Sequence, residues 1–188
     1  MIGFITLYTG SMKSGKTSKL FEVLDKAKYR KGIKSCLVRP IIDDREFIGR
    51  QYKSGEGYQV FTCRFLLEIK EVLKEYDIIC IDEGQFLLDL GPMSNELALM
   101  GKEVYIAALN GDSEMKPWDS VSNLLPFVDY IEKFSGVCEE CGKARRITFS
   151  FFTKKKTDQT IIGDGEYKIY CRECYKKLSD IKNDSSSK

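Results

Sequence analysis

The sequence predicts an α/β protein whose parallel sheet is flanked by helices and followed by a small cysteine-rich domain. Three observations predict this architecture. Apolar runs rich in β-branched residues alternate with helical patterns, as in parallel sheets joined by crossover helices. A loop with glycines and a lysine separates the first such run from the first helical pattern. Beyond about residue 135, cysteines, glycines and basic residues replace the alternation, which indicates a second domain.

The first three elements have clear signals. Residues 3–9 form a β-branched and aromatic run that predicts the first strand. Residues 16–31 place apolar side chains at helical spacing, and Gly32 follows where a helix C-cap would sit. Residues 35–40 predict the second strand, which Pro40 closes.

The rest of the sheet domain continues the alternation. Residues 41–63 show weak periodicity, so we expect a loop with a short strand at 58–62. The run 76–83 is largely apolar and ends in two acidic residues, which is typical of a buried parallel strand. The remaining elements are expected as helices at 65–76 and near 90–100 and as a buried strand at 103–110.

Composition excludes several classes of function. The 188 residues are 43% hydrophobic and 31% charged, and the net charge of +2 gives no support for binding to nucleic acid or a membrane. The chain has no histidine, which excludes histidine-based catalysis and histidine metal sites. Residues 1–10 lack the basic leader of a signal peptide, and no apolar run approaches the ~20 residues that cross a bilayer. We therefore expect a cytoplasmic protein.

The loop after the first strand has the spacing of a phosphate-binding loop. Its pattern is Gly10-x4-Gly15-Lys16-Thr17, between a predicted strand and a predicted helix. Glycines let backbone N–H groups turn toward an anion, and the helix N-terminus adds a partial positive charge. Lys16 would reach the β and γ phosphates, and the Thr17 hydroxyl would bind Mg²⁺. The alternative is a glycine-rich helix start that holds no ligand.

Two carboxylates follow the buried strand at 76–83. Asp82 would lie at the carboxyl edge of the sheet, where open α/β sheets bind ligands, and is a candidate partner of Mg²⁺. Glu83 beside it could accept a proton from an attacking hydroxyl or orient a water molecule. The alternative is that both acids only cap a helix.

Two Cys-x2-Cys pairs predict a structural zinc site of four thiolates in a zinc-ribbon-like domain. A closed four-thiolate site leaves no open position for catalysis, and we expect the small domain to fold only around its metal. Two disulfides are the alternative, although a reducing compartment disfavours them. The expected ligands are Cys138, Cys141, Cys171 and Cys174. The other cysteines, expected to be ordinary buried thiols, are Cys36, Cys63 and Cys80.

These signals divide the chain into three parts. Residues 1–134 are expected to form a P-loop NTPase-like α/β nucleotide-binding domain, and 135–177 the zinc-binding domain. Short β-like pieces within the second domain lie at 145–152 and 166–171. Residues 178–188 are polar and low in complexity, so we expect a disordered tail.

Taken in this order, the motifs resemble those of the type II thymidine kinases, the zinc-containing cellular and bacterial group. The resemblance covers about residues 3 to 176 and rests on "TGSMKSGKT", "DEGQF", "AALNGD" followed by "KPW", and "GDGEY" ahead of the second cysteine pair. It implies transfer of the γ-phosphoryl group of ATP to the 5′-hydroxyl of thymidine, with deoxyuridine as a further acceptor, in deoxynucleotide salvage. It also implies a homotetramer and feedback inhibition by dTTP.

The resemblance further implies roles for individual residues. Glu83 matches the catalytic base, and Asp43 with Arg45 matches an Asp-x-Arg element near the phosphates and Mg²⁺. The residues implied to bind ATP are Gly10, Ser11, Met12, Lys13, Ser14, Gly15, Lys16, Thr17, Asp43, Arg45, Asp82 and Gln85. A lasso loop within 149–167 is implied to close over the base. The residues implied to bind the nucleoside are Met12, Phe86, Leu109, Trp118, Thr148, Ile161, Ile162, Gly163 and Tyr167.

Three positions depart from the family pattern. Lys13 and Ser113 stand where relatives usually have aromatic residues, and Ser150 replaces the arginine of a Thr-x-Arg element. These departures bear on nucleoside preference and leave the transfer residues intact. Two other functions remain open from the sequence: an ATPase that acts on nucleic acid through its zinc domain, and a non-catalytic adaptor with a vestigial phosphate loop.

Overall fold

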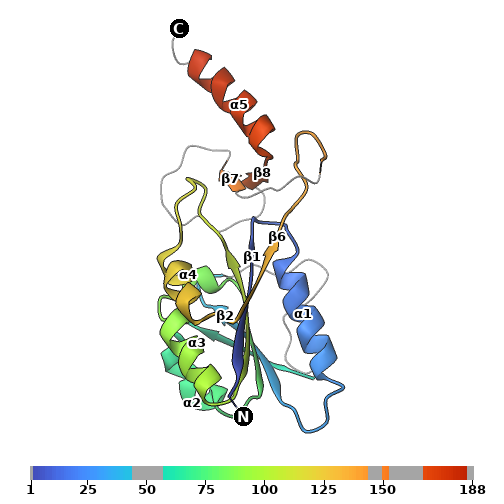
Figure 1. Ribbon diagram of the computed structural model, residues 1–188, viewed down its shortest axis with the longest axis vertical. Coiled ribbons are helices and arrows are strands. Elements are labelled where there is room, and N and C mark those ends of the chain that lie inside the picture. Colours follow the sequence, from blue (N-terminus) through green and yellow to red (C-terminus); the bar gives the residue numbers. More distant parts are fainter. Residues whose placement is uncertain (1, 44–56, 144–149, 153–166, 186–188) are drawn as a thin grey trace.

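A computed structural model describes residues 2–43, 57–143, 150–152 and 167–185 (Figure 1). Arg45, Thr148, Ile161, Ile162 and Gly163 lie outside the described residues, as does most of the segment expected to form the lasso. Among the described residues, no helix has the length and apolar character needed to cross a membrane.

Six parallel strands form the main sheet in the order β3-β2-β4-β5-β1-β6, which confirms the predicted α/β class. β2 and β4 are buried along their whole length, because helices cover both faces of the sheet centre. The strands are β1 (Phe4–Gly10), β2 (Ser35–Pro40), β3 (Gln59–Cys63), β4 (Ile78–Ile81), β5 (Glu103–Leu109) and β6 (Tyr130–Phe134).

Helices cover the two faces of the sheet unequally (Figure 1). α1 (Lys16–Ala27) packs Leu20 and Leu24 into a smaller core on one face. A larger core on the opposite face joins the sheet to α3 (Leu90–Leu99) and α4 (Asp119–Leu124). The shorter elements are the 3-10 helices η1 (Leu66–Ile69), η2 (Gly84–Phe86) and η3 (Leu125–Phe127), and helix α2 (Lys70–Leu73).

Two predicted helices are shorter in the structure. α1 ends at Ala27, because the chain then turns through Gly32, whose φ of 77° suits glycine. The helix predicted at 65–76 is divided into η1 and α2 and ends at Leu73. The Asp89 carboxylate accepts two backbone N–H bonds at the start of η1, and the chain must turn back before β4 begins.

The cysteine-rich lobe contains a small antiparallel pair and the last helix. β7 (Ser150–Phe152) pairs with β8 (Tyr167–Ile169), and α5 follows from Arg172 to Ser185. Within the segment 178–188, which the sequence predicts to be a disordered tail, the structure describes 178–185 as part of helix α5. The first turn of α5 carries Cys174, and an ion pair of 3.1 Å between Lys177 and Glu173 supports that turn.

Helices α3 and α4 approach each other closely at Gly91. A Cβ atom built there would lie 2.8 Å from the carbonyl oxygen of Asn123, which is backbone and cannot move aside. We predict that Gly91→Ala lowers the free energy of unfolding by about 1–3 kcal/mol, the usual cost of overpacking a core. Urea denaturation measures this. The control is Leu99→Ala on the exposed side of α3, which should change stability little; equal losses in both variants would contradict the close-contact explanation.

Candidate active site and cysteine cluster

The candidate active site lies where three neighbouring strands end. β4, β5 and β1 are adjacent and parallel, so their carboxyl ends meet at one edge of the sheet. The glycine-rich loop follows β1, and the acidic pair Asp82 and Glu83 follows β4. Crevices at this edge are where open α/β sheets bind ligands.

The phosphate loop has the conformation that its sequence predicts. Gly15 is the N-cap of α1 and has a φ of 97°, a value that disfavours any residue with a Cβ atom. Lys16 is 7% exposed, and its ammonium group donates a 2.7 Å hydrogen bond to the carbonyl oxygen of Ser11. Ser14 Oγ donates to the same carbonyl at 2.8 Å. The loop backbone therefore surrounds the buried ammonium group of Lys16, and this arrangement suits an anionic phosphate chain.

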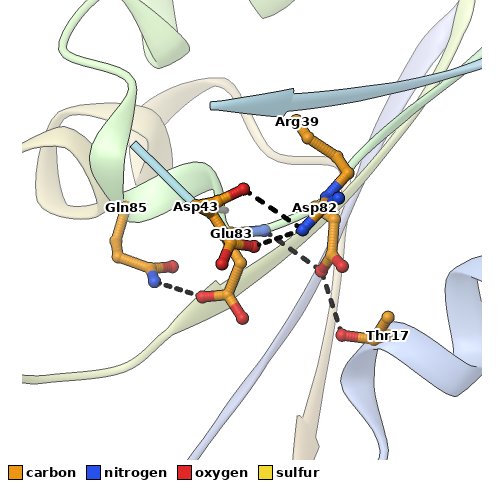
Figure 2. A network of polar contacts seen from close by, with 6 residues as sticks. All are labelled: Thr17, Arg39, Asp43, Asp82, Glu83 and Gln85. Carbon is orange, nitrogen blue, oxygen red and sulfur yellow. Dashed lines mark hydrogen bonds and ion pairs between the residues drawn. The ribbon is translucent and has the colours of Figure 1, made fainter. Parts of the chain in front are cut away.

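A hydroxyl and a carboxylate meet between the loop and β4. Thr17 Oγ1 donates to Asp82 Oδ1 at 3.0 Å, and the backbone N–H of Glu83 donates to the same oxygen at 3.1 Å (Figure 2). Asp82 is 1% exposed. Hydroxyl and carboxylate oxygens are the ligand types that hold Mg²⁺ beside nucleotide phosphates. The residues present therefore fit a magnesium ion bound with its nucleotide.

Glu83 is held in position by Gln85. Glu83 has a φ of 52°, in the left-handed region that is costly for a residue with a side chain. Gln85 Nε2 donates to Glu83 Oε2 at 2.5 Å (Figure 2). Gln85 Oε1 accepts from the N–H of Leu109 at 3.0 Å. Ser120 Oγ donates to the Gln85 carbonyl at 2.7 Å. Sequence reasoning placed Gln85 among ATP contacts; its described bonds lie within the protein.

Arg39 is a functional candidate that sequence reasoning missed. Its Nη2 lies 2.9 Å from Asp43 Oδ2 and also donates to the Asp43 carbonyl at 3.3 Å. Both side chains are at least nine-tenths buried, so this ion pair fixes Asp43 near the sheet edge. The signal was present: an arginine inside an apolar strand needs a buried partner.

A cavity of about 940 Å³ is lined in part by Gln85, the hydrogen-bond partner of Glu83. Its lining includes Gln85, Phe86 and Trp118, and the Phe86 and Trp118 rings meet edge to face at 5.5 Å. Two other predicted nucleoside residues do not line this cavity: Met12 packs against the cysteine lobe, and the Tyr167 carbonyl contacts Lys13. Leu109 is the last residue of β5, and its backbone N–H donates a hydrogen bond to Gln85 Oε1.

The predicted metal ligands form one cluster. The Sγ atoms of Cys138, Cys141, Cys171 and Cys174 all lie within 4.8 Å of one another. All are free thiols, which argues against two separate disulfides. A tetrahedral Zn²⁺ with bonds of ~2.3 Å places its sulfurs ~3.8 Å apart, close to the 3.9 Å between Cys141 and Cys171.

Local backbone donors prepare this cluster for a cation. Burial raises the pKa of the Cys138 thiol, but backbone N–H groups of Cys141, Cys171 and Glu140 outweigh burial and lower that pKa to about 6. One of them, the N–H of Cys171, lies 3.3 Å from Cys138 Sγ. Because thiolates are the form that binds metal, the lowered pKa favours Cys138 as a ligand, whereas burial raises the pKa of Cys174 to about 12, so that thiol must lose its proton as metal binds.

Fold and site together define a class: a P-loop kinase with a four-cysteine lobe. The family model for thymidine kinase matches residues 3–175, and the chain belongs to the thymidine kinase family. Thymidine kinase 1 of Dictyostelium discoideum is 35% identical over 193 residues, covering 99% of this chain and 82% of that protein. The thymidine kinases of Sheeppox virus (strain KS-1) and Vaccinia virus (strain Ankara) are 31% and 30% identical, each covering 92% of this chain and 97% of its own length. The family resemblance predicted from the motifs is confirmed.

We predict that Cys171→Ser loses bound metal, because the variant removes one of four ligands. Metal content by atomic emission should fall from about one ion per chain to a small fraction of that, and the protein should become more sensitive to proteolysis in the cysteine lobe. Cys36→Ala, which changes a buried cysteine outside the cluster, should keep its metal. Unchanged metal content in the Cys171 variant would rule out the four-cysteine site.

Proposed function

We propose that the chain is a thymidine kinase that transfers the γ-phosphoryl group of ATP to the 5′-hydroxyl of thymidine, with deoxyuridine as a further acceptor. The single observation that carries the proposal is the group of Lys16, Thr17, Asp82 and Glu83 at one sheet edge, in a chain of the thymidine kinase family. This reaction would serve deoxynucleotide salvage.

The phosphate loop would hold the nucleotide. Its backbone N–H groups and the start of α1 face the α and β phosphates, and Lys16 would leave the Ser11 carbonyl for the β and γ phosphates. Thr17 and Asp82 would hold Mg²⁺, which neutralises charge on the oxygens of the transferred group. Asp43, with Arg45 outside the described residues, would lie beside them.

Glu83 would act as the general base. It accepts the proton of the 5′-hydroxyl while that oxygen forms a bond to the γ phosphorus, and the bond from phosphorus to the β–γ bridging oxygen breaks, so that ADP leaves. A base helps only when it is aligned with the acceptor. The bond from Gln85 and the anchoring of Gln85 to Leu109 and Ser120 supply that alignment.

The cavity lined by Phe86 and Trp118 would receive the nucleoside. Its aromatic rings suit a planar base, and Gln85, which also lines it, links the cavity to Glu83. Met12, Leu109 and Tyr167 would complete the pocket. Ser113 lacks the ring of relatives, so we expect weaker selection between thymidine and deoxyuridine.

Several features of the family complete the proposal. The cysteine cluster would hold structural zinc, and magnesium would enter with ATP. The protein would act as a homotetramer in the cytoplasm, dTTP would inhibit it as the end product, and it would need neither nucleic acid nor a membrane.

Turnover assays test the proposal directly. ADP formation by purified protein with MgATP is measured against each common nucleoside and against single-stranded DNA. We expect turnover only with thymidine or deoxyuridine, with thymidine 5′-monophosphate as product. Turnover that depends on DNA and ignores nucleosides would overturn the proposal in favour of a nucleic-acid ATPase.

We predict that Glu83→Gln lowers kcat for thymidine by about 10²–10⁴-fold, the usual contribution of a positioned general base. Binding of MgATP, measured by calorimetry, should stay within about twofold, because the amide keeps the size of the carboxylate. A kcat close to that of the wild type would remove Glu83 as the base.

We predict that Gln85→Leu lowers kcat by about 10- to 100-fold, because Glu83 loses the hydrogen bond that orients it. The Michaelis constant for ATP should change little. Gln85→Glu is the matched variant. It keeps the shape of the side chain but places a second carboxylate against Glu83, so its kcat should also be lowered. If both variants keep normal kcat, Glu83 does not depend on Gln85.

A further inference from the structure

Lys13 departs from the family pattern, and the structure gives its side chain a location of its own. It lies in the phosphate loop with a φ of 55°, one of three non-glycine residues with positive φ in the described chain. Its Nζ lies 2.9 Å from Glu139 Oε1 and 3.3 Å from the carbonyl oxygen of Tyr167.

Both partners of Lys13 belong to the cysteine lobe. Glu139 lies directly after Cys138, and its N–H donates to the carbonyl of Ile169 in β8 at 3.0 Å. Tyr167 is the first residue of β8, the strand that leads to the second cysteine pair. One cation therefore connects the phosphate loop to both halves of the metal cluster.

Packing beside Lys13 strengthens this connection. Met12 is partly buried against the apolar side of the cysteine cluster. A Cβ atom built on Gly136 would lie 2.7 Å from Ile169 Cδ1, 3.6 Å from Ser11 Oγ and 3.7 Å from the carbonyl oxygen of Met12. The loop backbone from Ser11 to Lys13 is thus in contact with the lobe on one side, while Lys16 holds it from the other.

We propose that Lys13 is a positioning residue that couples nucleotide binding at the phosphate loop to nucleoside binding through Tyr167 of the cysteine lobe. Phosphates draw Lys16 away from the Ser11 carbonyl, and the loop adjusts on the side that Lys13 ties to Glu139 and Tyr167. MgATP then fixes the position of Tyr167. This inference rests on the proposed function, in which Tyr167 contacts the nucleoside. By linkage, the nucleoside favours the nucleotide to the same degree.

The expected size of the coupling follows from the solvent exposure of the ion pair between Lys13 and Glu139. The Lys13 and Glu139 side chains are 42% and 31% exposed, so their ion pair is partly screened by water. Pairs of this kind change an equilibrium by about twofold to fivefold. Coupling of that size should also weaken as salt concentration rises.

Calorimetry tests the coupling. The dissociation constant for thymidine is measured with and without the Mg²⁺ complex of an ATP analogue that carries an imido β–γ bridge. In the wild type the analogue should tighten thymidine binding, and Lys13→Met should reduce that gain by about twofold to fivefold. Glu139→Gln should reduce the coupling to the same degree. The double variant should reduce it no further than either single variant, because all three lose the same ion pair.

Three further measurements decide the interpretation. Lys13→Arg should restore most of the coupling, and Lys26→Met, which removes an exposed lysine from α1, should leave it intact. Metal content should be equal in all variants. A Lys13→Met protein that binds the analogue tenfold more weakly with normal coupling would overturn the proposal and make Lys13 a phosphate ligand. Unchanged coupling and unchanged affinity would overturn it as well.

Hydrogen exchange separates this inference from the proposed function. With the ATP analogue alone, amides of residues 136–142 and 167–175 should become more protected in the wild type and not in Lys13→Met. This result needs no thymidine. If the wild type fails to bind thymidine but shows the protection, the proposed substrate is wrong and the connection stands; if protection is absent in the wild type, the connection itself is wrong.

Discussion

The hydrogen bond between Thr17 and Asp82 is the contact on which the site depends. It joins the helix after β1 to the end of β4, two strands that are separated by β5 in the sheet. Because parallel strands present their carboxyl ends at one edge, residues far apart in sequence come within 3.0 Å of each other there. The site is thus built on the rigid part of the fold, where a displaced strand would separate the proposed metal ligands.

Near that contact, an energetically unfavourable backbone conformation orients a functional side chain. Glu83 adopts a left-handed backbone conformation immediately after β4, and Gln85 fixes its carboxylate from one side. Such strain persists only where neighbours determine it, and it is typical of sites where geometry matters more than stability. The cysteine lobe contacts the phosphate loop through Lys13 and through packing at Met12. Two binding regions therefore share one short loop.

The sequence predicted what is local and missed what is distant. The phosphate loop follows from glycine conformations within a few residues, and the strand at 35–40 matches β2. β6 was not predicted, because an edge strand with exposed residues lacks the apolar run that indicates a buried strand. The hydrogen bonds of Gln85 could not be predicted, since its partners Leu109 and Ser120 are 24 and 35 residues away. Composition alone could not predict that 178–185 continue a helix whose first turn carries Cys174 of the cysteine cluster.

Binding of Mn²⁺ in place of Mg²⁺, followed by electron paramagnetic resonance, tests the central claim most directly. With the imido analogue of ATP present, the wild type should bind one Mn²⁺ tightly per chain. Thr17→Ala and Asp82→Asn should each weaken that ion at least tenfold without preventing nucleotide binding, and the double variant should lose less than the product of the two effects, because both residues serve one ion. Mn²⁺ affinity that is the same in all four proteins would contradict the account, since the contact between Thr17 and Asp82 would then hold the fold and not the metal.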